Sequence, residues 1–139
     1  MARRSPGAAP LRGVHVLLVC DDIERCELFA QALTYAGALV TSSASADAAR
    51  AVLDRVRPNV VVVELRDADD RARFVAAVRA LPAERGGKIP ALALTSSHEH
   101  GEALLAAGFQ LHVVMPVRAA ELCGAVAALS RQPAAWPRL

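Results

Sequence analysis

The chain of 139 residues suits a single domain that buries a core of its own. Its 54% hydrophobic and 22% charged residues exclude an intrinsically disordered chain. The 16 basic and 14 acidic side chains nearly cancel and are spread along the sequence, so nucleic acid and anionic membranes are not expected partners.

Signals for targeting are absent from the sequence pattern. No apolar run approaches the ~20 residues of a membrane span, and no apolar stretch follows Arg3 and Arg4 as it would in a signal peptide. The three cysteines, Cys20, Cys26 and Cys123, have no metal-ligand spacing. We therefore expect a cytoplasmic protein with reduced thiols.

The first predicted elements are a strand, a helix and a second strand. Residues 14–19 form a short run rich in β-branched side chains, which predicts a strand buried on both faces. Asp21 or Asp22 can cap the helix that follows, and Gly37 stands where that helix is expected to end before a strand at 38–42. The apolar stripe of this helix consists of Cys26, Phe29, Leu33 and Ala36.

The middle of the chain contains the clearest strand. Ser45 is a predicted N-cap for a helix that ends before Pro58. Residues 59–64 include four consecutive valines, which are too apolar for a strand with one solvent-exposed face.

The second half of the chain continues the same alternation. We expect helices at 69–81 and 98–107, strands at 89–94 and 111–114, and a last helix marked by Leu122, Val126 and Leu129. Five strand-helix units predict an α/β fold, a doubly wound five-stranded parallel sheet with helices on both faces. We place this single domain at 11–131, between tails at 1–10 and 132–139.

Functional residues are expected where the parallel strands end. In open α/β sheets, the working site lies at the carboxyl ends of the strands. The residues at those positions are Cys20, Asp21, Asp22, Glu64, Thr95 and Met115.

Several segments, in this order and at this spacing, are similar to a known family. They are VLLVCDD at 16–22, RPNVVVVE at 57–64, LPAERGGKIP at 81–90, ALT at 93–95, AAGF at 106–109 and VVMPV at 113–117. Together they resemble the CheY-like receiver domain of response regulators in two-component phosphorelay signalling, over about residues 11–130. The resemblance implies the flavodoxin-like variant of the predicted fold.

The residues that carry the family's chemistry are largely replaced. The family uses two adjacent acidic residues for magnesium, an aspartate as phosphoacceptor, a Ser/Thr and a mobile aromatic as switch, and a lysine before a proline. By position these are Cys20 and Asp21, then Glu64, then Thr95 and His112, then Met115. The acidic pocket keeps Asp21, with Asp22 beside it, and the segment 65–69 also departs from the family pattern.

These replacements predict that phosphoryl transfer is lost. Cys20 offers a soft thiol where Mg²⁺ prefers oxygen ligands, and Met115 offers no cation for the phosphoryl group. Glu64 carries its carboxylate about 1.5 Å further out than an aspartate would. We expect no catalytic residue and no cofactor, with Mg²⁺ bound only weakly, if at all, by Asp21 and Glu64.

Single residues allow alternative interpretations. Glu64 either mimics the phosphorylated state or is a carboxylate that is solvated or paired with Arg66. Thr95 and His112 either form a switch or are a strand-end threonine and a surface histidine. Asp21 and Asp22 either hold a divalent ion or cap a helix.

The cysteine at the end of the first strand suggests two further alternatives. A thiol near a helix N-terminus can have a lowered pKa and serve as a redox sensor. Cys20 is also similar to the nucleophile of low-molecular-weight tyrosine phosphatases, but their arginine six residues later is Cys26 here, and Arg25 is out of step. His98 and His100 are expected to be surface histidines, and Trp136 lies in the C-terminal tail.

Three functions follow, the first preferred. They are a phosphorylation-independent receiver that acts by protein–protein interaction, a receiver that still accepts phosphoryl weakly, and a cysteine phosphatase. The expected partner is a histidine kinase, another regulator or a second copy of the chain. We expect exposed contact residues on the last strand and its flanking helices, at His98, Glu102, His112, Val117 and Glu121. The short helix between Gly101 and Gly108 is expected to be the most mobile part of that face.

Overall fold

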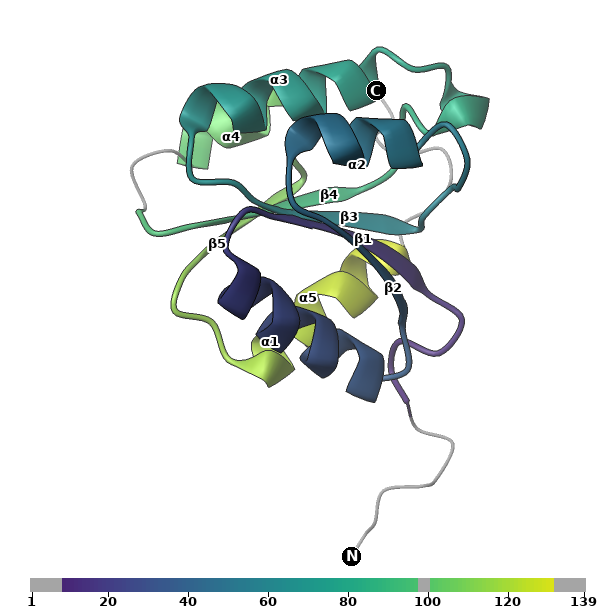
Figure 1. Ribbon diagram of the computed structural model, residues 1–139, viewed down its shortest axis with the longest axis vertical. Coiled ribbons are helices and arrows are strands. Elements are labelled where there is room, and N and C mark those ends of the chain that lie inside the picture. The colour runs from purple at the N-terminus through teal and green to yellow at the C-terminus, as the bar shows by residue number, and fades with distance from the viewer. Residues whose placement is uncertain (1–8, 98–100, 132–139) are drawn as a thin grey trace, which may run out of the picture.

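The four-valine segment forms the centre of a five-stranded parallel sheet (Figure 1). The computed structural model describes residues 9–97 and 101–131. The strand order is β2-β1-β3-β4-β5, which is the doubly wound order of the flavodoxin-like fold. The strands are β1 (His15–Cys20), β2 (Leu39–Ser43), β3 (Val60–Glu64), β4 (Ala91–Thr95) and β5 (Leu111–Val114).

Helices cover both faces of the sheet. In Figure 1, α1 and α5 lie on one face, and α2, α3 and α4 lie on the other. Their bounds are α1 (Ile23–Tyr35), α2 (Ala46–Val52), α3 (Ala68–Arg79), α4 (Gly101–Ala107) and α5 (Ala119–Ser130), with a 3-10 turn η1 (Ala83–Arg85). The predicted fold class and the order of elements are therefore confirmed.

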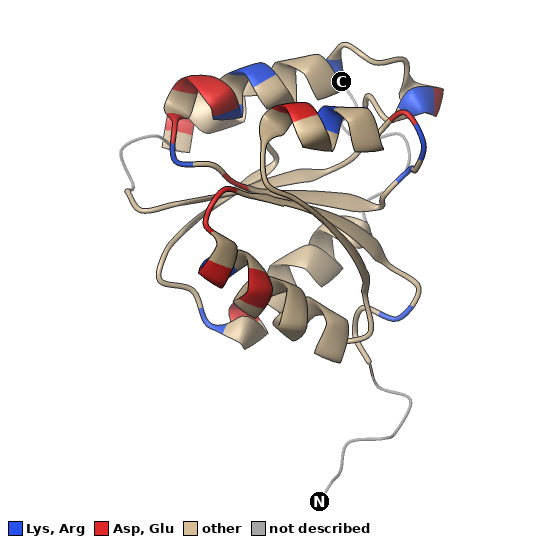
Figure 2. Cartoon of the chain, in the orientation of Figure 1, with Lys and Arg blue, Asp and Glu red and all other residues tan. Residues whose placement is uncertain are grey.

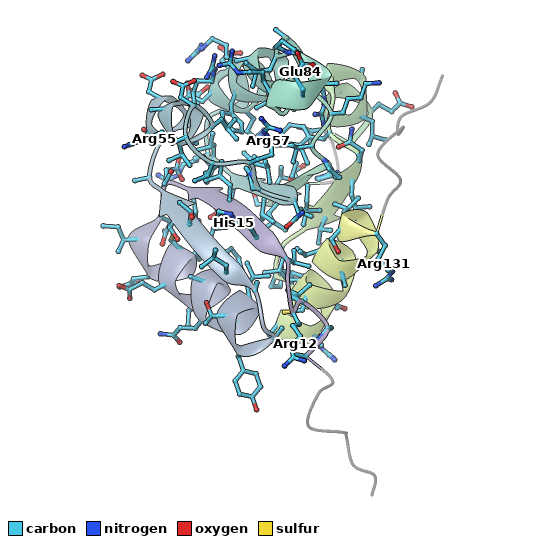
Figure 3. All side chains as sticks on the ribbon, turned by 90° about the vertical axis from the view of Figure 1, so that its right-hand side faces the viewer. Arg12, His15, Arg55, Arg57, Glu84 and Arg131 are labelled. Atoms are coloured by element: carbon cyan, nitrogen blue, oxygen red, sulfur yellow. The ribbon has the colours of Figure 1, made fainter. Side chains whose placement is uncertain are left out.

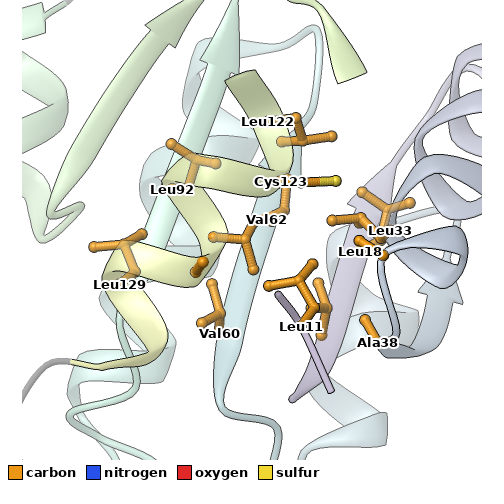
Figure 4. Close-up of a cluster of buried hydrophobic side chains, with 14 of the residues drawn as sticks. Leu11, Leu18, Leu33, Ala38, Val60, Val62, Leu92, Leu122, Cys123 and Leu129 are labelled. Atoms are coloured by element: carbon orange, nitrogen blue, oxygen red, sulfur yellow. The ribbon is translucent and has the colours of Figure 1, made fainter. Parts of the chain in front are cut away.

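The alternation of side chains along β3 explains why this strand is apolar throughout. Val60 and Val62 face α1 and α5, and Val61 and Val63 face α2 and α3, so each pair joins a separate core. Figure 4 shows the first core, where Leu18 and Leu33 meet residues of α5. A strand in this position has no solvent-exposed face. Burial of each valine contributes roughly 1.5–3 kcal/mol to the stability of the fold.

Local capping sets where the helices begin and end. Ser45 accepts a hydrogen bond from the N–H of Ala48 at 3.1 Å, as predicted for the N-cap of α2. Asp67 caps α3, so this helix begins at Ala68, one residue earlier than expected. Gly37 has φ of +107° directly after α1, a conformation that favours glycine.

The amino ends of the strands carry none of the sequence-predicted site residues. Figure 3 looks at this end, with Arg55 and Arg57 ahead of β3 and with His15 in β1. His15 is held there by Thr41, whose Oγ1 lies 2.8 Å from its Nε2. Within the part of the chain that the structure describes, no helix is long and apolar enough to cross a membrane. His98, His100 and Trp136 lie outside the described residues.

Candidate functional site at the carboxyl edge of the sheet

The strand ends bring the predicted site residues to one edge. Cys20 and Glu64 are register partners at the ends of β1 and β3. Thr95 ends β4, and Met115 directly follows β5, where its N–H donates to the carbonyl of Thr95 at 2.7 Å. The sheet order places these four residues at adjacent strand ends, as the sequence predicted.

Glu64 is buried and both of its carboxylate oxygens are engaged. Its side chain is only 5% exposed. The Cys20 thiol donates to Oε1 at 2.8 Å, while the Arg25 guanidinium donates to Oε2 through Nε at 3.1 Å and pairs through Nη2 at 2.9 Å. The interpretation of Glu64 as solvated or paired with Arg66 is therefore wrong, because the cation comes from α1.

Arg25 is the functional residue that the sequence reasoning missed. It lies in the first turn of α1, and this helix leaves β1 beside the end of β3. The hydrogen bond to Glu64 raises the pKa of the Arg25 guanidinium. The signal available in the sequence was an arginine in the helical turn after the acidic segment, but nothing in the sequence identified its partner.

The two aspartates after β1 have separate structural roles. Asp22 caps α1, since its Oδ1 accepts the N–H of Arg25 at 3.0 Å, and this bond lowers the pKa of Asp22. Asp21 is exposed and accepts the backbone N–H of Arg66 at 3.0 Å, which ties the β1–α1 loop to the β3–α3 loop. Figure 2 shows acidic positions at the starts of α1 and α3, with a basic position between β3 and α3.

The Cys20 thiol is buried and hydrogen-bonded. It is 2% exposed, and burial together with the hydrogen bond to Glu64 raises its pKa. The redox alternative needs a lowered thiol pKa, and the phosphatase alternative needs a reactive thiol, whereas burial of Cys20 acts in the opposite direction.

The remaining donors at this edge do not fit a magnesium ion. Across residues 9–97 and 101–131, no three His, Cys, Asp or Glu side chains are grouped so that they could hold a metal. Glu64 is already neutralised by Arg25, and the sulfur of Cys20 is a soft ligand for a hard ion.

Thr95 and His112 are brought together across β4 and β5. The Oγ1 of Thr95 and the Nε2 of His112 are 2.6 Å apart, and Thr95 also donates to the carbonyl of Ser97 at 3.0 Å. His112 and Val117 are half-buried, so the expectation that both are exposed is wrong, whereas Glu102 and Glu121 are exposed as expected. His112 is half-buried because its ring lies against Thr95 on the neighbouring strand.

A buried arginine lies at the start of α3. Arg71 is 5% exposed, and its Nη1 donates to the carbonyl oxygens of Leu65 at 2.6 Å and Arg66 at 3.3 Å. These bonds shape the segment 65–69, which departs from the family pattern. Its Nε is buried and has no hydrogen-bond partner among the described residues.

Comparisons with known proteins agree with this architecture. No family model matches the chain. An uncharacterized 14.6 kDa protein of Leptolyngbya boryana, from the sodA1 3' region, is 32% identical over 115 residues, which cover 81% of this chain and 86% of the relative. This chain and that protein are members of one family.

Solved structures identify the kind of domain. The receiver domain of the sensor histidine kinase PA1611 of Pseudomonas aeruginosa, solved with magnesium in its active-site cleft, is 25% identical with a TM-score of 0.77, over 86% of this chain and 99% of that one. The Vibrio cholerae chemotaxis response regulator CheY4 is 24% identical with a TM-score of 0.75, over 84% and 98% of the two chains. A putative response regulator of Chloroflexus aurantiacus is 23% identical with a TM-score of 0.79, over 86% and 98%.

The strand order, the positions of the edge residues and these similarities lead to one assignment. The chain belongs to the CheY-like receiver domains of two-component response regulators.

Proposed function

We propose that this receiver works without phosphorylation, as a protein–protein interaction module and not as an enzyme, in the cytoplasm. The observation that carries the proposal is the engagement of Glu64 by Cys20 and Arg25. Phosphoryl acceptance needs a carboxylate oxygen that is free to attack and a metal ion beside it. Here both oxygens are held by donors of the chain itself.

The charge balance of the edge supports the same proposal. In a receiver that accepts phosphoryl, the lysine and the metal ion counter the charge of the transferred group. Met115 removes the first of these cations, and Arg25 neutralises the acidic position permanently. A domain whose trigger is replaced by a fixed ion pair is expected to remain in one conformational state, because no ligand distinguishes two states.

The partner is proposed to be a histidine kinase, another regulator or a second copy of the chain. A surface held in one conformation loses less freedom on binding, which favours a constitutive contact. We propose the face formed by α4, β5 and α5, where Glu102 and Glu121 are exposed, as the contact surface.

A competing surface lies at the other edge of the sheet, around α1 and β2. The exposed large hydrophobic residues of the described chain are mainly on α1 and β2, and α4 contributes a single one. They are Ile23, Leu28, Tyr35 and Leu39, compared with Leu105 on α4. Exposed apolar side chains can mark contact surfaces, so the experiments must separate the two surfaces.

The test is incubation with acetyl phosphate, with and without magnesium, followed by intact-mass measurement. We expect no mass increase of one phosphoryl group in the natural chain. The matched positive control is the triple variant Cys20→Asp, Glu64→Asp, Met115→Lys, which is expected to regain some labelling. Ready labelling of the natural chain would instead support the alternative of a weak phosphoacceptor.

A further inference from the structure

A groove opens at the carboxyl edge, between the β3–α3 loop, α1 and the segment after β5. Its volume is about 630 Å³, within the roughly 300–1,000 Å³ that suits small-molecule ligands. Charged, polar and apolar residues line it. The charged lining consists of three arginines, Arg25, Arg66 and Arg71, and one carboxylate, Glu64.

Two of the three arginines are not paired with a carboxylate. Arg25 is neutralised by Glu64 and lies 3.6 Å from Asp22. Arg66 is exposed, and its guanidinium makes no hydrogen bond or ion pair within the described chain. Arg71 is 5% exposed and bonds only to carbonyl oxygens, so its charge is buried without a counter-ion among the described residues.

The buried charge of Arg71 is the observation that points to a ligand. A buried cation is normally paired, because taking an unpaired charge out of water is costly. Its Nε is buried and lacks an acceptor, and the side chain lines the groove. An anion placed there would supply the missing counter-charge, and a planar carboxylate matches the donor geometry of guanidinium groups.

The groove also has an apolar lining. It is formed by Leu28 and Phe29 of α1 and by Met115, Pro116 and Val117 after β5. Leu28 is 63% exposed, which leaves apolar surface beside the arginines uncovered. A ligand that is only an ion would leave this lining in contact with water, whereas an apolar body would cover it.

We infer that this groove binds a small organic anion, a carboxylate attached to an apolar or aromatic body. The carboxylate lies against Arg66 and Arg71, and the body lies against Leu28 and the segment 115–117. Binding is non-covalent and needs no metal. It occupies the edge where the family carries out phosphoryl chemistry, so the receiver would sense a metabolite in place of phosphorylation.

The experiment is an NMR titration of the ¹⁵N-labelled full chain with three separate probes. Sodium phenylacetate carries the anion and the apolar body, phenylacetamide is its neutral counterpart, and inorganic phosphate is an anion without a body. We expect saturable shifts at residues 65–71 and 115–117 with phenylacetate. The neutral amide should bind about tenfold more weakly, because a charge-assisted contact is lost.

Variants test the assignment of the cations. Arg66→Gln and Arg71→Gln are each expected to weaken phenylacetate binding by about tenfold. Arg73→Gln is the matched control, since Arg73 is exposed on the same helix and pairs with Asp70 outside the groove, and it should bind within twofold of the natural chain. If Arg71→Gln does not fold, the exposed Arg66 still decides the question.

Three outcomes would overturn the inference. They are shifts that map away from the groove, equal binding of the amide and the carboxylate, or no saturation by phenylacetate at any concentration up to about 20 mM. Stronger binding of phosphate than of phenylacetate would also overturn it, because the apolar lining would then have no role. The titration uses the isolated chain, so its result is independent of the proposed protein partner.

Discussion

Glu64 and Arg25 form the ion pair that defines this receiver. The carboxylate is at the end of β3 and the guanidinium is in the first turn of α1, 39 residues earlier in the chain, with Oε2 and Nη2 2.9 Å apart. The pair joins the first turn of α1 to the end of β3. This internal contact therefore lies at the position where the family uses a metal ion and a phosphoryl group.

Replacing Arg25 with methionine should destabilise the fold. The change leaves the Glu64 carboxylate buried without its cation. We expect the free energy of unfolding to fall by about 2 kcal/mol, below the full value for a buried pair because the Arg25 side chain is 41% exposed. Chemical denaturation at pH 7 measures this change.

The matched control for that change is Arg50→Met on α2. Arg50 pairs with Asp54 at 3.2 Å, but both side chains are well exposed. Loss of this surface pair should lower the free energy of unfolding by less than about 0.5 kcal/mol. Equal effects of the two substitutions would show that Glu64 does not depend on Arg25.

The stability should fall at alkaline pH because of Cys20. Burial and the bond to Glu64 raise the pKa of the folded thiol, so above roughly 8.5 the unfolded chain loses a proton that the folded chain keeps. The contribution of this thiol to the free energy of unfolding is fully present below that pH. It is lost progressively above that pH, by at most about 2 kcal/mol at pH 10.

Comparison of the natural chain with Cys20→Ala isolates the thiol. Denaturation midpoints measured from pH 7 to pH 10 should decline less steeply in the variant. Parallel declines in the two proteins would assign the pH dependence to other groups, with Cys123 the next candidate, because burial raises its pKa as well.

Two glycine substitutions should have opposite effects on stability. A Cβ at Gly87 would lie 1.9 Å from the carbonyl oxygen of Leu81, so Gly87→Ala should cost about 3 kcal/mol or more. At Gly124, on the exposed side of α5, a Cβ meets nothing within 4 Å. Gly124→Ala should stabilise the chain by about 0.5–1 kcal/mol, measured by thermal or chemical unfolding.

Substitutions on two faces should locate the contact surface. Glu121→Lys and Glu102→Lys should weaken partner binding or self-association, because both side chains are exposed on the proposed face of α4, β5 and α5. Gln31→Lys on α1 is the control and should bind like the natural chain. Gln31 is preferable to Arg25 here, because a change at Arg25 also breaks the pair with Glu64.

The opposite result would place the contact surface on α1 and β2. Loss of binding in Gln31→Lys, with normal binding in both other variants, would favour the exposed apolar residues of α1 and β2. Tyr35, which is 94% exposed, would then be the first residue to substitute.

The sequence by itself was sufficient for the fold, because the fold follows from local patterns. The valine run at 60–63 predicts a strand buried on both faces, and Ser45 and Gly37 mark helix ends through bonds to nearby backbone. The carboxyl-edge site could be predicted as well, since it depends only on where parallel strands end. Alignment by position also identified which of the family's functional residues are replaced in this chain.

Only the tertiary structure decided which side chains meet at that edge. The sequence offered Arg66 as a partner for Glu64 because it is two residues away, yet the Arg66 side chain is exposed and makes no bond to Glu64. The actual partner, Arg25, arrives through the path of α1 out of β1. The burial of Arg71 and the contact of His112 with Thr95 likewise depend on packing between elements distant in sequence, which no local pattern records.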